Sequence, residues 1–487
     1  MTNLSVKDLT PTQKEAYDAI INGENVFLTG DAGTGKSTVL NLAQEYFEEH
    51  DIVPIATAPT GIAAINIEGI TLHQLLKLHR SPFTNPVSKE SEDNIRSFFS
   101  HGGILIIDEI SMCRMDLFEY LIKALDKIKA KIQIILVGDF YQLPPVVSFQ
   151  EKDKYLTEFG NNIYPFQSKY WSKLKLKTFV LHEIVRQKGE ANKYFSQALN
   201  HIRLNDNQML NAVNYINQQT VSEFDPHATI LCGRNKTATK VNNEQLTKVN
   251  ADLLSFNASH DKNIPKTYYA NDELLQFKVG ARVISVANLY NKNKELLAAN
   301  GEIGTIINIE NDNGKINFKA PHSLKHINSP VKLTVQWDNG IISDVTWHAW
   351  EIYNYVKKDN KIVHEELGNY IQMPLKLAYA ITIHKSQGQT LSSVNIKNAY
   401  GEIFAQGQLY VALSRVRNMS EMHLEVPISA KSLIPNLAVT EFYRSIDPNM
   451  PQVHITKNQA IMTLGQTVNK LTPEQILQIN QFIKNNY

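Results

Sequence analysis

Residues 30–37 constrain the fold of this chain more than any other segment. They read GDAGTGKS and match the pattern G-x-x-x-x-G-K-[ST]. The apolar residues 26–28 before them predict a strand, and residues 38–43 after them predict a helix. Glycines in such a loop let backbone N–H groups point inward and hold an anion at the N-terminus of the following helix. The strand–loop–helix order therefore predicts a site for a nucleoside triphosphate.

Two side chains of this segment have predicted roles. Lys36 is expected to neutralise the β- and γ-phosphates, and the Ser37 hydroxyl is expected to ligate Mg²⁺. The expected cofactors are therefore ATP and Mg²⁺. The residues predicted to surround the phosphates are Gly30, Asp31, Ala32, Gly33, Thr34, Gly35, Lys36, Ser37 and Thr38.

Two buried strands are predicted to bring catalytic side chains to the same site. Residues 104–107 form an apolar run that ends in Asp108 and Glu109, as in a parallel strand that opens on a ligand crevice. Asp108 is expected to hold the Mg²⁺ through water, and Glu109 to polarise the water that attacks the γ-phosphate. Gln142 follows the second run, residues 132–137, and is expected to sense the γ-phosphate. The pattern predicts an α/β domain that hydrolyses its nucleotide.

Gln13 has two possible roles near the start of the chain. Thr10 suits a helix N-cap, and Pro11 suits the first helical position. The Gln13 amide could bind an adenine edge, as amide side chains do elsewhere. It could equally be the last member of an ordinary capping box. Spacing leaves both interpretations open.

Composition sets only wide limits on function. A chain of 487 residues predicts about three domains. No apolar stretch approaches the roughly 18 residues that a membrane helix needs, so no membrane partner is expected. Cys113 and Cys232 cannot supply a four-thiolate metal site. The net charge of +1 neither indicates nor excludes nucleic acid, because only the local field acts on a phosphate backbone.

Seven segments in order resemble the motifs of superfamily-one helicases that move 5′→3′. The resemblance is greatest to the petite-integration-frequency (PIF) family, with RecD-like and Dda-like helicases as relatives. In the first half the segments are residues 30–37, 58–64 with 71–73, 108–111 and 138–145. In the second half they are residues 181–187, 377–391 and 410–417. Together with the N-terminal segment they cover residues 9 to about 417.

The resemblance implies further residues around the ATP. Arg186 and Arg415 are the expected arginine fingers, because an arginine that enters from a second lobe stabilises the charge on the γ-phosphoryl oxygens. A lone arginine is more often a surface ion pair, so this role depends on the motifs. Gly388 is the remaining residue expected at the nucleotide.

The resemblance also implies a track for single-stranded DNA across both lobes. Hydroxyls, imidazoles and amides against phosphates position a strand without reading its sequence. The residues expected to contact DNA are Thr60, Gly61 and His73 in the first lobe, and Asn288, Thr382, His384 and Lys385 in the second.

The implied fold class is α/β, with two RecA-like P-loop NTPase lobes, a small SH3-like β-barrel insertion and a short helical C-terminal tail. The expected boundaries are 1–185 for the first lobe, 186–290 plus 371–445 for the second, 291–370 for the insertion and 446–487 for the tail. The turn at residues 338–340 between alternating strands predicts a hairpin in the insertion. The tryptophans of the insertion have two possible roles, which are stacking on bases and filling the barrel core. They are Trp337, Trp347 and Trp350.

Residues 77–100 interrupt the first lobe and resemble the small wedge insertion of the family. Phe83 would be the strand-separating side chain of such a wedge.

The sequence therefore predicts an ATP-dependent DNA helicase that moves 5′→3′, with roles in repair, recombination, replication or telomere maintenance. One alternative is an ATP-driven translocase or nucleoprotein remodeller without unwinding, and another is a P-loop switch or kinase. No nuclease motif is evident. Expected partners are single-stranded and forked DNA, with single-strand-binding or repair and replication proteins as further candidates. A monomer is expected, cytoplasmic and nucleoid-associated in a bacterium or phage, and nuclear or mitochondrial in a eukaryote.

Overall fold

The structure is a computed structural model. It describes residues 5–450, apart from 32, 79–80, 129, 149, 184–189, 221–222, 263, 292–294, 312–315, 322–330, 359–360, 388, 400, 430–431 and 448–449.

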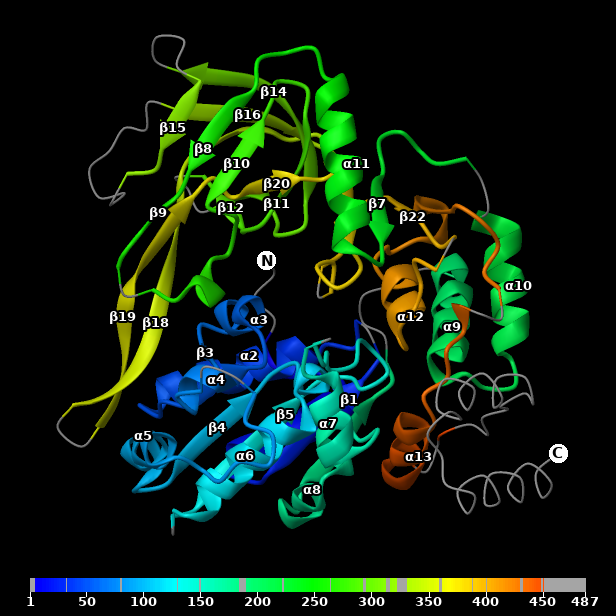
Figure 1. Cartoon of the computed structure of the whole chain (residues 1–487). Helices are drawn as coiled ribbons and strands as arrows, with labels where there is room; N and C mark the ends of the chain where they lie inside the picture. The colour runs from blue at the N-terminus through cyan, green and yellow to red at the C-terminus, as the bar shows by residue number, and fades with distance from the viewer. Residues whose placement is uncertain are drawn as a thin grey trace.

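The first lobe is built on a six-stranded parallel sheet, as the α/β prediction requires (Figure 1). Its strands are β1 (Val26–Gly30), β2 (Ile55–Ala58), β3 (Ile70–Thr71), β4 (Gly103–Ile107), β5 (Ile132–Val137) and β6 (Lys177–Leu181). They lie in the order β3-β2-β4-β5-β1-β6. Parallel strands expose the same end at one edge, so the loops after β1, β4 and β5 meet there.

Helices cover both faces of this sheet and bury two separate apolar clusters. One cluster joins α1 and α2 to the sheet, and the other joins it to α4, α5 and α6. The helices are α1 (Pro11–Ile21), α2 (Lys36–Glu49), α3 (Gly61–Asn66), α4 (Leu72–Leu75), α5 (Lys89–Phe99), α6 (Met115–Asp126), α7 (Lys152–Phe159) and α8 (Lys169–Lys173). Short 3-10 turns are η1 (Val6–Asp8), η2 (Ile110–Met112) and η3 (Pro165–Gln167).

The second lobe has a smaller parallel sheet of four strands in the order β21-β7-β22-β23. They are β7 (Thr229–Cys232), β21 (Ala380–Thr382), β22 (Val394–Ile396) and β23 (Met422–Leu424). The helices of this lobe are α9 (Glu190–Leu204), α10 (Met209–Thr220), α11 (Asn235–Lys248) and α12 (Gln408–Leu413), followed by the turn η6 (Met419–Glu421).

A β-rich body interrupts the second lobe between β7 and β21. Its main sheet has the order β17-β16-β14-β11-β20, and smaller sheets have the orders β10-β8-β15, β18-β19-β9 and β12-β13. The strands are β8 (Leu254–Asn257), β9 (Ser259–His260), β10 (Leu274–Phe277), β11 (Arg282–Ser285), β12 (Leu289–Tyr290), β13 (Leu296–Ala298), β14 (Ile303–Asn311), β15 (Asn317–Lys319), β16 (Val331–Trp337), β17 (Ile342–Val345), β18 (His348–Lys358), β19 (Lys361–Gln372) and β20 (Leu375–Leu377), with the turn η4 (Lys266–Tyr268). The long β18–β19 hairpin extends from this body down beside the first lobe (Figure 1).

The observed body starts earlier in the chain than the predicted boundary at residue 291. Strand β11 pairs with β14 and β20, and β8 pairs with β15, so residues before 291 belong to the same sheets as residues after it. The hairpin predicted at residues 338–340 is present as the β16–β17 turn. The body therefore extends from about 254 to 377.

Helix α13 (Leu437–Ile446) returns from the second lobe to the first. Its Val439 and Tyr443 are buried in the same apolar cluster as Phe27 and Phe140 of the first lobe. The predicted tail, residues 446–487, lies almost entirely outside the described residues. Within the described part of the chain, no helix has the length and apolar character needed to span a membrane.

Candidate nucleotide and DNA sites

The P-loop connects β1 to α2, as its sequence pattern predicts. Gly35 has a φ of +83°, and a Cβ atom there would lie 2.5 Å from the Gln13 side chain. Gly30 has a φ of +141°, and its Cβ would lie 2.2 Å from the carbonyl oxygen of Leu181. Only glycine fits these two positions. The remaining described residues of the predicted cradle, Gly33, Thr34, Ser37 and Thr38, lie in this loop and the first turn of α2, and Ala32 lies outside the described residues.

The Lys36 ammonium group lies inside the loop. It donates to the carbonyl oxygens of Gly30 and Asp31 at 2.8 and 2.9 Å. Burial lowers the pKa of Lys36. A phosphate oxygen offers a charged acceptor in place of these two carbonyls, so the lysine is positioned for the role that the sequence predicts.

Gln13 closes the loop from α1. Its Oε1 accepts from the backbone N–H of Thr10 at 2.9 Å, so the capping-box interpretation is confirmed. Its Nε2 also donates to the carbonyl oxygen of Thr34 at 2.8 Å. The amide therefore holds the P-loop itself, and adenine binding by Gln13 stays a prediction.

Asp108 and Glu109 lie directly after β4 at the same sheet edge. The backbone N–H of Glu109 donates to Oδ1 of Asp108 at 2.9 Å. Burial raises the pKa of Asp108. Burial and then the neighbouring Asp108 raise the pKa of Glu109 to about 7. A carboxyl group with such a pKa can both accept and release a proton near neutral pH.

The donors at this edge fit a magnesium ion. The Ser37 hydroxyl and the Asp108 carboxylate are hard oxygen ligands, which Mg²⁺ prefers together with water and phosphate oxygens. Among the described residues, no group of three or more His, Cys, Asp or Glu side chains could hold a metal ion. The Ser37 and Asp108 oxygens therefore suit a Mg²⁺ ion that is bound together with a nucleotide, and they do not form an all-protein metal site.

Gln387 of the second lobe contacts two of the predicted catalytic residues of the first lobe. Its Nε2 donates to Oε2 of Glu109 and to Oε1 of Gln142, both at 3.2 Å. Its own Oε1 is buried and has no hydrogen-bond partner among the described residues. Sequence reasoning did not single out this glutamine, although it lies in the 377–391 segment next to Gly388. Gly388 itself lies outside the described residues.

The two predicted arginine fingers have different outcomes. Arg186 lies outside the described residues. Arg415 is buried, and its guanidinium donates to the carbonyl oxygens of Val411, Ser386 and Gln389 at 2.7, 2.9 and 3.1 Å. Its positive charge also acts on Glu109, whose pKa it lowers against the larger effects of burial and Asp108. These contacts join Arg415 to its own helix at Val411 and to the 386–389 segment, and a direct contact with phosphate stays a prediction.

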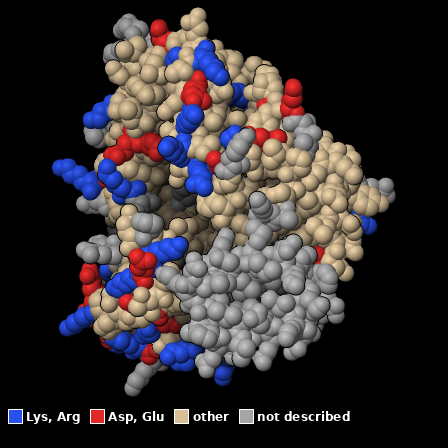
Figure 2. Space-filling view, turned by 45° about the vertical axis from the view of Figure 1, so that its right-hand side comes forward, with Lys and Arg blue, Asp and Glu red and all other residues tan. Residues whose placement is uncertain are grey.

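The predicted DNA residues of the first lobe lie near its junction with the β-rich body. Thr60 caps α3, accepting from the N–H of Ala63 at 3.3 Å, and Gly61 begins that helix. His73 lies in α4, and burial lowers its pKa. Just before it, the N–H of Thr71 donates to the Tyr268 hydroxyl of the body at 3.1 Å. Figure 2 shows the surface hollowed between the body and the first lobe, with Lys and Arg side chains beside it.

Three predicted DNA residues of the second lobe share one short segment. Thr382 ends β21 and accepts from the N–H of Lys385 at 3.3 Å. Lys385 is exposed, and burial lowers the pKa of His384. Asn288 lies apart from them in the β-rich body, where it is exposed and accepts from the N–H of Asn300 at 2.8 Å.

Four aromatic residues considered for DNA contacts are buried. Trp337, Trp347 and Trp350 are 1%, 5% and 7% exposed, so they fill cores and offer no open face to a base. Phe83 is 9% exposed and packs against Tyr155. The ring of Phe83 belongs to an apolar cluster of the first lobe, so it offers no exposed face in this structure, and its strand-separating role stays a prediction.

Comparison with known proteins agrees with this arrangement. Residues 8–213 match the family model described as PIF1-like helicase. The ATP-dependent DNA helicase Pif1 of Campylobacter jejuni is 30% identical over 433 residues, which cover 84% of this chain and 90% of that protein. Human ATP-dependent DNA helicase PIF1 is 29% identical over 430 residues, which cover 85% of this chain and 60% of that protein.

Solved structures give the same result for the fold. Pif1 from a Bacteroides species in complex with ADP-AlF4 is 30% identical and has a TM-score of 0.73, covering 90% of this chain and 97% of that one. The same helicase bound to single-stranded DNA is 29% identical and has a TM-score of 0.58, covering 90% of this chain and 96% of that one. This chain is therefore more similar to the first arrangement than to the DNA-bound one.

Proposed function

This chain belongs to the PIF1-like helicase family, and from that premise we propose that it hydrolyses ATP to move 5′→3′ on single-stranded DNA and to separate duplex strands. The observation that carries the proposal is the contact of Gln387 with Glu109 and Gln142. Glu109, which we propose activates the attacking water, is in direct contact with the second lobe through Gln387. A movement between the lobes would therefore change the hydrolytic site.

Each residue at the sheet edge has a part in hydrolysis. Lys36 binds the β- and γ-phosphates after leaving the carbonyl oxygens of Gly30 and Asp31. Ser37, and Asp108 through water, would hold a Mg²⁺ ion, which would supply charge that stabilises the phosphoryl oxygens. Glu109 accepts the proton of the attacking water. The arginines of the second lobe, Arg186 and Arg415, complete the site when the lobes close.

The DNA path lies across both lobes, which we infer to be RecA-like. The hydroxyl, imidazole and ammonium groups of Thr60, His73, His384 and Lys385 suit phosphate contacts that do not depend on sequence. The β-rich body, inferred to be SH3-like, would hold the strand against the first lobe at the Thr71–Tyr268 junction. The 5′→3′ direction comes from the family resemblance.

A translocase that moves on DNA without unwinding it is the second candidate. The buried position of Phe83 favours it, because the residue expected to separate strands is not exposed to them. Strand separation and translocation can be distinguished, since both require ATP turnover but only a helicase releases a base-paired strand.

The test compares release of a base-paired strand with displacement of streptavidin from the end of a biotinylated single strand. A helicase is expected to do both with ATP and Mg²⁺, and Glu109→Gln is the matched control that should bind ATP and do neither. Streptavidin displacement without strand release supports the translocase. ATP turnover that is indifferent to DNA contradicts both.

A further inference from the structure

Arg203 connects the two lobes behind the P-loop. It lies in the last turn of α9, where Leu199 and Ile202 are buried in the core of the second lobe. Its guanidinium reaches the first lobe instead, where Nε and Nη2 donate to the two carboxylate oxygens of Asp139 at 3.2 and 3.0 Å. Nη1 lies 2.6 Å from Oδ1 of Asp31. One side chain from the second lobe thus pairs with the P-loop and with the start of the 138–145 segment.

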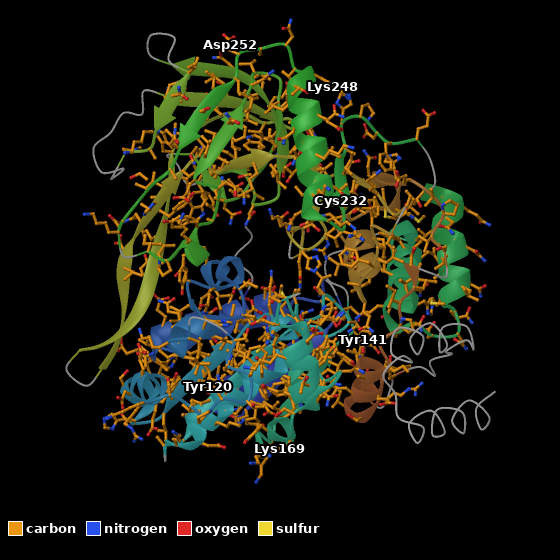
Figure 3. All side chains as sticks on the ribbon, viewed as in Figure 1. Tyr120, Tyr141, Lys169, Cys232, Lys248 and Asp252 are labelled. Carbon is orange, nitrogen blue, oxygen red and sulfur yellow. The ribbon has the colours of Figure 1, made fainter. Side chains whose placement is uncertain are left out.

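This cluster is almost fully removed from water. The side chains of Arg203, Asp31 and Asp139 are 2%, 7% and 0% exposed. The guanidinium also lies 4.6 and 5.5 Å from the ring centres of Tyr141 and Tyr443, and Figure 3 labels Tyr141 beside α13. A bidentate, buried and stacked arrangement fixes the position of an arginine far more than a surface pair does.

The charges of the cluster depend on one another. Burial raises the pKa of Asp31, and Arg203 opposes that effect. Although burial alone would lower it, the carboxylates of Asp139 and Asp31 hold the pKa of Arg203 well above its ordinary value. Without Arg203, two buried carboxylates would face each other next to the place where a triphosphate enters, because Asp31 is the second residue of the P-loop.

Asp31 and Asp139 each also contact a residue that is expected to act on the nucleotide. The carbonyl oxygen of Asp31 accepts from Nζ of Lys36 at 2.9 Å, while its carboxylate pairs with Arg203. Asp139 is followed three residues later by Gln142, whose Nε2 donates back to Oδ2 of Asp139 at 3.4 Å. A movement of α9 would therefore shift Asp31 and, with it, Lys36. It would also shift Asp139 and, with it, Gln142.

We propose that Arg203 is a positioning residue for ATP hydrolysis, which neutralises Asp31 beside the nucleotide and couples the P-loop and Gln142 to the second lobe. The inference rests on the proposed function and deepens it, because it names a physical link between the nucleotide site and the lobe that carries Thr382, His384 and Lys385. Arg203 acts through its two carboxylate partners, so its effect differs from that of an arginine finger.

The test is a charge-rescue experiment with steady-state ATP turnover, measured with and without single-stranded DNA. Arg203→Gln leaves both carboxylates without their cation, and KM for ATP should rise by about tenfold or more, within the usual range of coupling between sites. Asp31→Asn in the same chain removes one of the two charges and should lower KM again, to within about threefold of the wild type. Arg203→Lys keeps the positive charge but loses the two parallel N–H donors of the guanidinium. KM for ATP should therefore change little, while the stimulation of ATP turnover by DNA falls severalfold.

Arg96→Gln is the matched control, because Arg96 lies on α5, is half exposed and pairs only with Glu92 among the ion pairs of the described residues. It should match the wild type in every measurement.

A purely structural role for Arg203 predicts a lower melting temperature with unchanged KM and unchanged stimulation, and no rescue by Asp31→Asn; that result overturns the inference. If Arg203→Gln does not fold, Arg203→Lys with wild-type DNA stimulation overturns it as well. If the wild-type protein shows no ATP turnover, the proposed function itself is contradicted. Failure of the proposed function is thus distinguishable from failure of the role given to Arg203.

Discussion

The amide of Gln387 donates to the carboxylate of Glu109 across the interface between the lobes, at 3.2 Å. The same amide reaches Gln142, so one side chain of the second lobe contacts both the residue proposed to activate water and the residue expected to sense the γ-phosphate. Gln387 is only five residues beyond Thr382, at the start of the segment expected to contact DNA. One short stretch of chain therefore carries both a contact to Glu109 and the residues expected to contact DNA.

Gln387→Ala should lower the DNA-stimulated kcat by about tenfold, while KM for ATP stays within about twofold of the wild type. The reason is that Gln387 contacts Glu109 and Gln142, the two groups expected to act on the attacking water and the γ-phosphate, so its loss should lower kcat. Steady-state turnover with saturating DNA measures the effect. Gln276→Ala on the exposed face of β10 is the control, and a Gln387→Ala protein with unchanged kcat would contradict the role given to this contact.

Glu109→Gln should make the protein more stable at pH 8 in the absence of nucleotide and Mg²⁺. Burial and Asp108 raise the pKa of folded Glu109 from 4.5 to about 7. Its contribution to the free energy of unfolding is therefore fully present below pH 4.5 and is lost as the pH rises to about 7. Above that pH the glutamine should be favoured by on the order of 2 kcal/mol.

Urea unfolding between pH 5 and 8 measures this difference. It should grow with pH and level off above about 7. A difference that is constant with pH, or that favours the wild type at pH 8, contradicts the burial of an ionisable Glu109.

Tyr443→Phe should destabilise the docking of α13 on the first lobe. The Tyr443 hydroxyl lies 2.5 Å from Oγ1 of Thr29 and accepts from the N–H of Phe140 at 3.2 Å. Removal of the hydroxyl leaves these buried groups without that partner at a cost of about 1–3 kcal/mol. Urea unfolding measures the loss, with the exposed Tyr290 as the matched site for a Tyr→Phe control. A loss below about 0.5 kcal/mol would mean that the hydroxyl is not needed there.

Phe83→Ala should lower the stability of the first lobe by about 3 kcal/mol, because it empties a buried position. Lys154 and Arg114 lie over the Phe83 ring, at 4.2 and 5.5 Å from its centre, and they lose this contact too. At a temperature where the variant is folded, strand separation per ATP hydrolysed should match the wild type. Phe83→Leu keeps most of the volume and serves as the control. A stable Phe83→Ala protein that hydrolyses ATP but separates no strands would instead support the wedge role.

The local parts of the nucleotide site could be predicted from the sequence. Asp108 and Glu109 follow a buried strand directly, and Lys36 and Gln142 each lie in the loop after one, so strand pattern and motif place them at one sheet edge. The contacts that join the lobes could not be predicted in this way. Gln387 is 278 residues from Glu109 in the chain, and no periodicity connects them.

The start of the β-rich body was misplaced for a related reason. Strands β8 and β11 have only four residues each, so their sequences do not specify a partner. Their partners, β15 and β14, come later in the chain. The tryptophans likewise fit a core and a stacking surface equally well until their burial is known, since an aromatic side chain serves both.

Strand release from partial duplexes that carry either a 5′ or a 3′ single-stranded tail tests the central claim most directly. The reactions contain ATP and Mg²⁺, and ATP turnover is recorded in the same tubes with Lys36→Ala as the inactive control. We predict release from the 5′-tailed duplex alone, together with DNA-stimulated turnover. Release from the 3′-tailed duplex alone would contradict the direction, and turnover that survives Lys36→Ala would contradict the P-loop site.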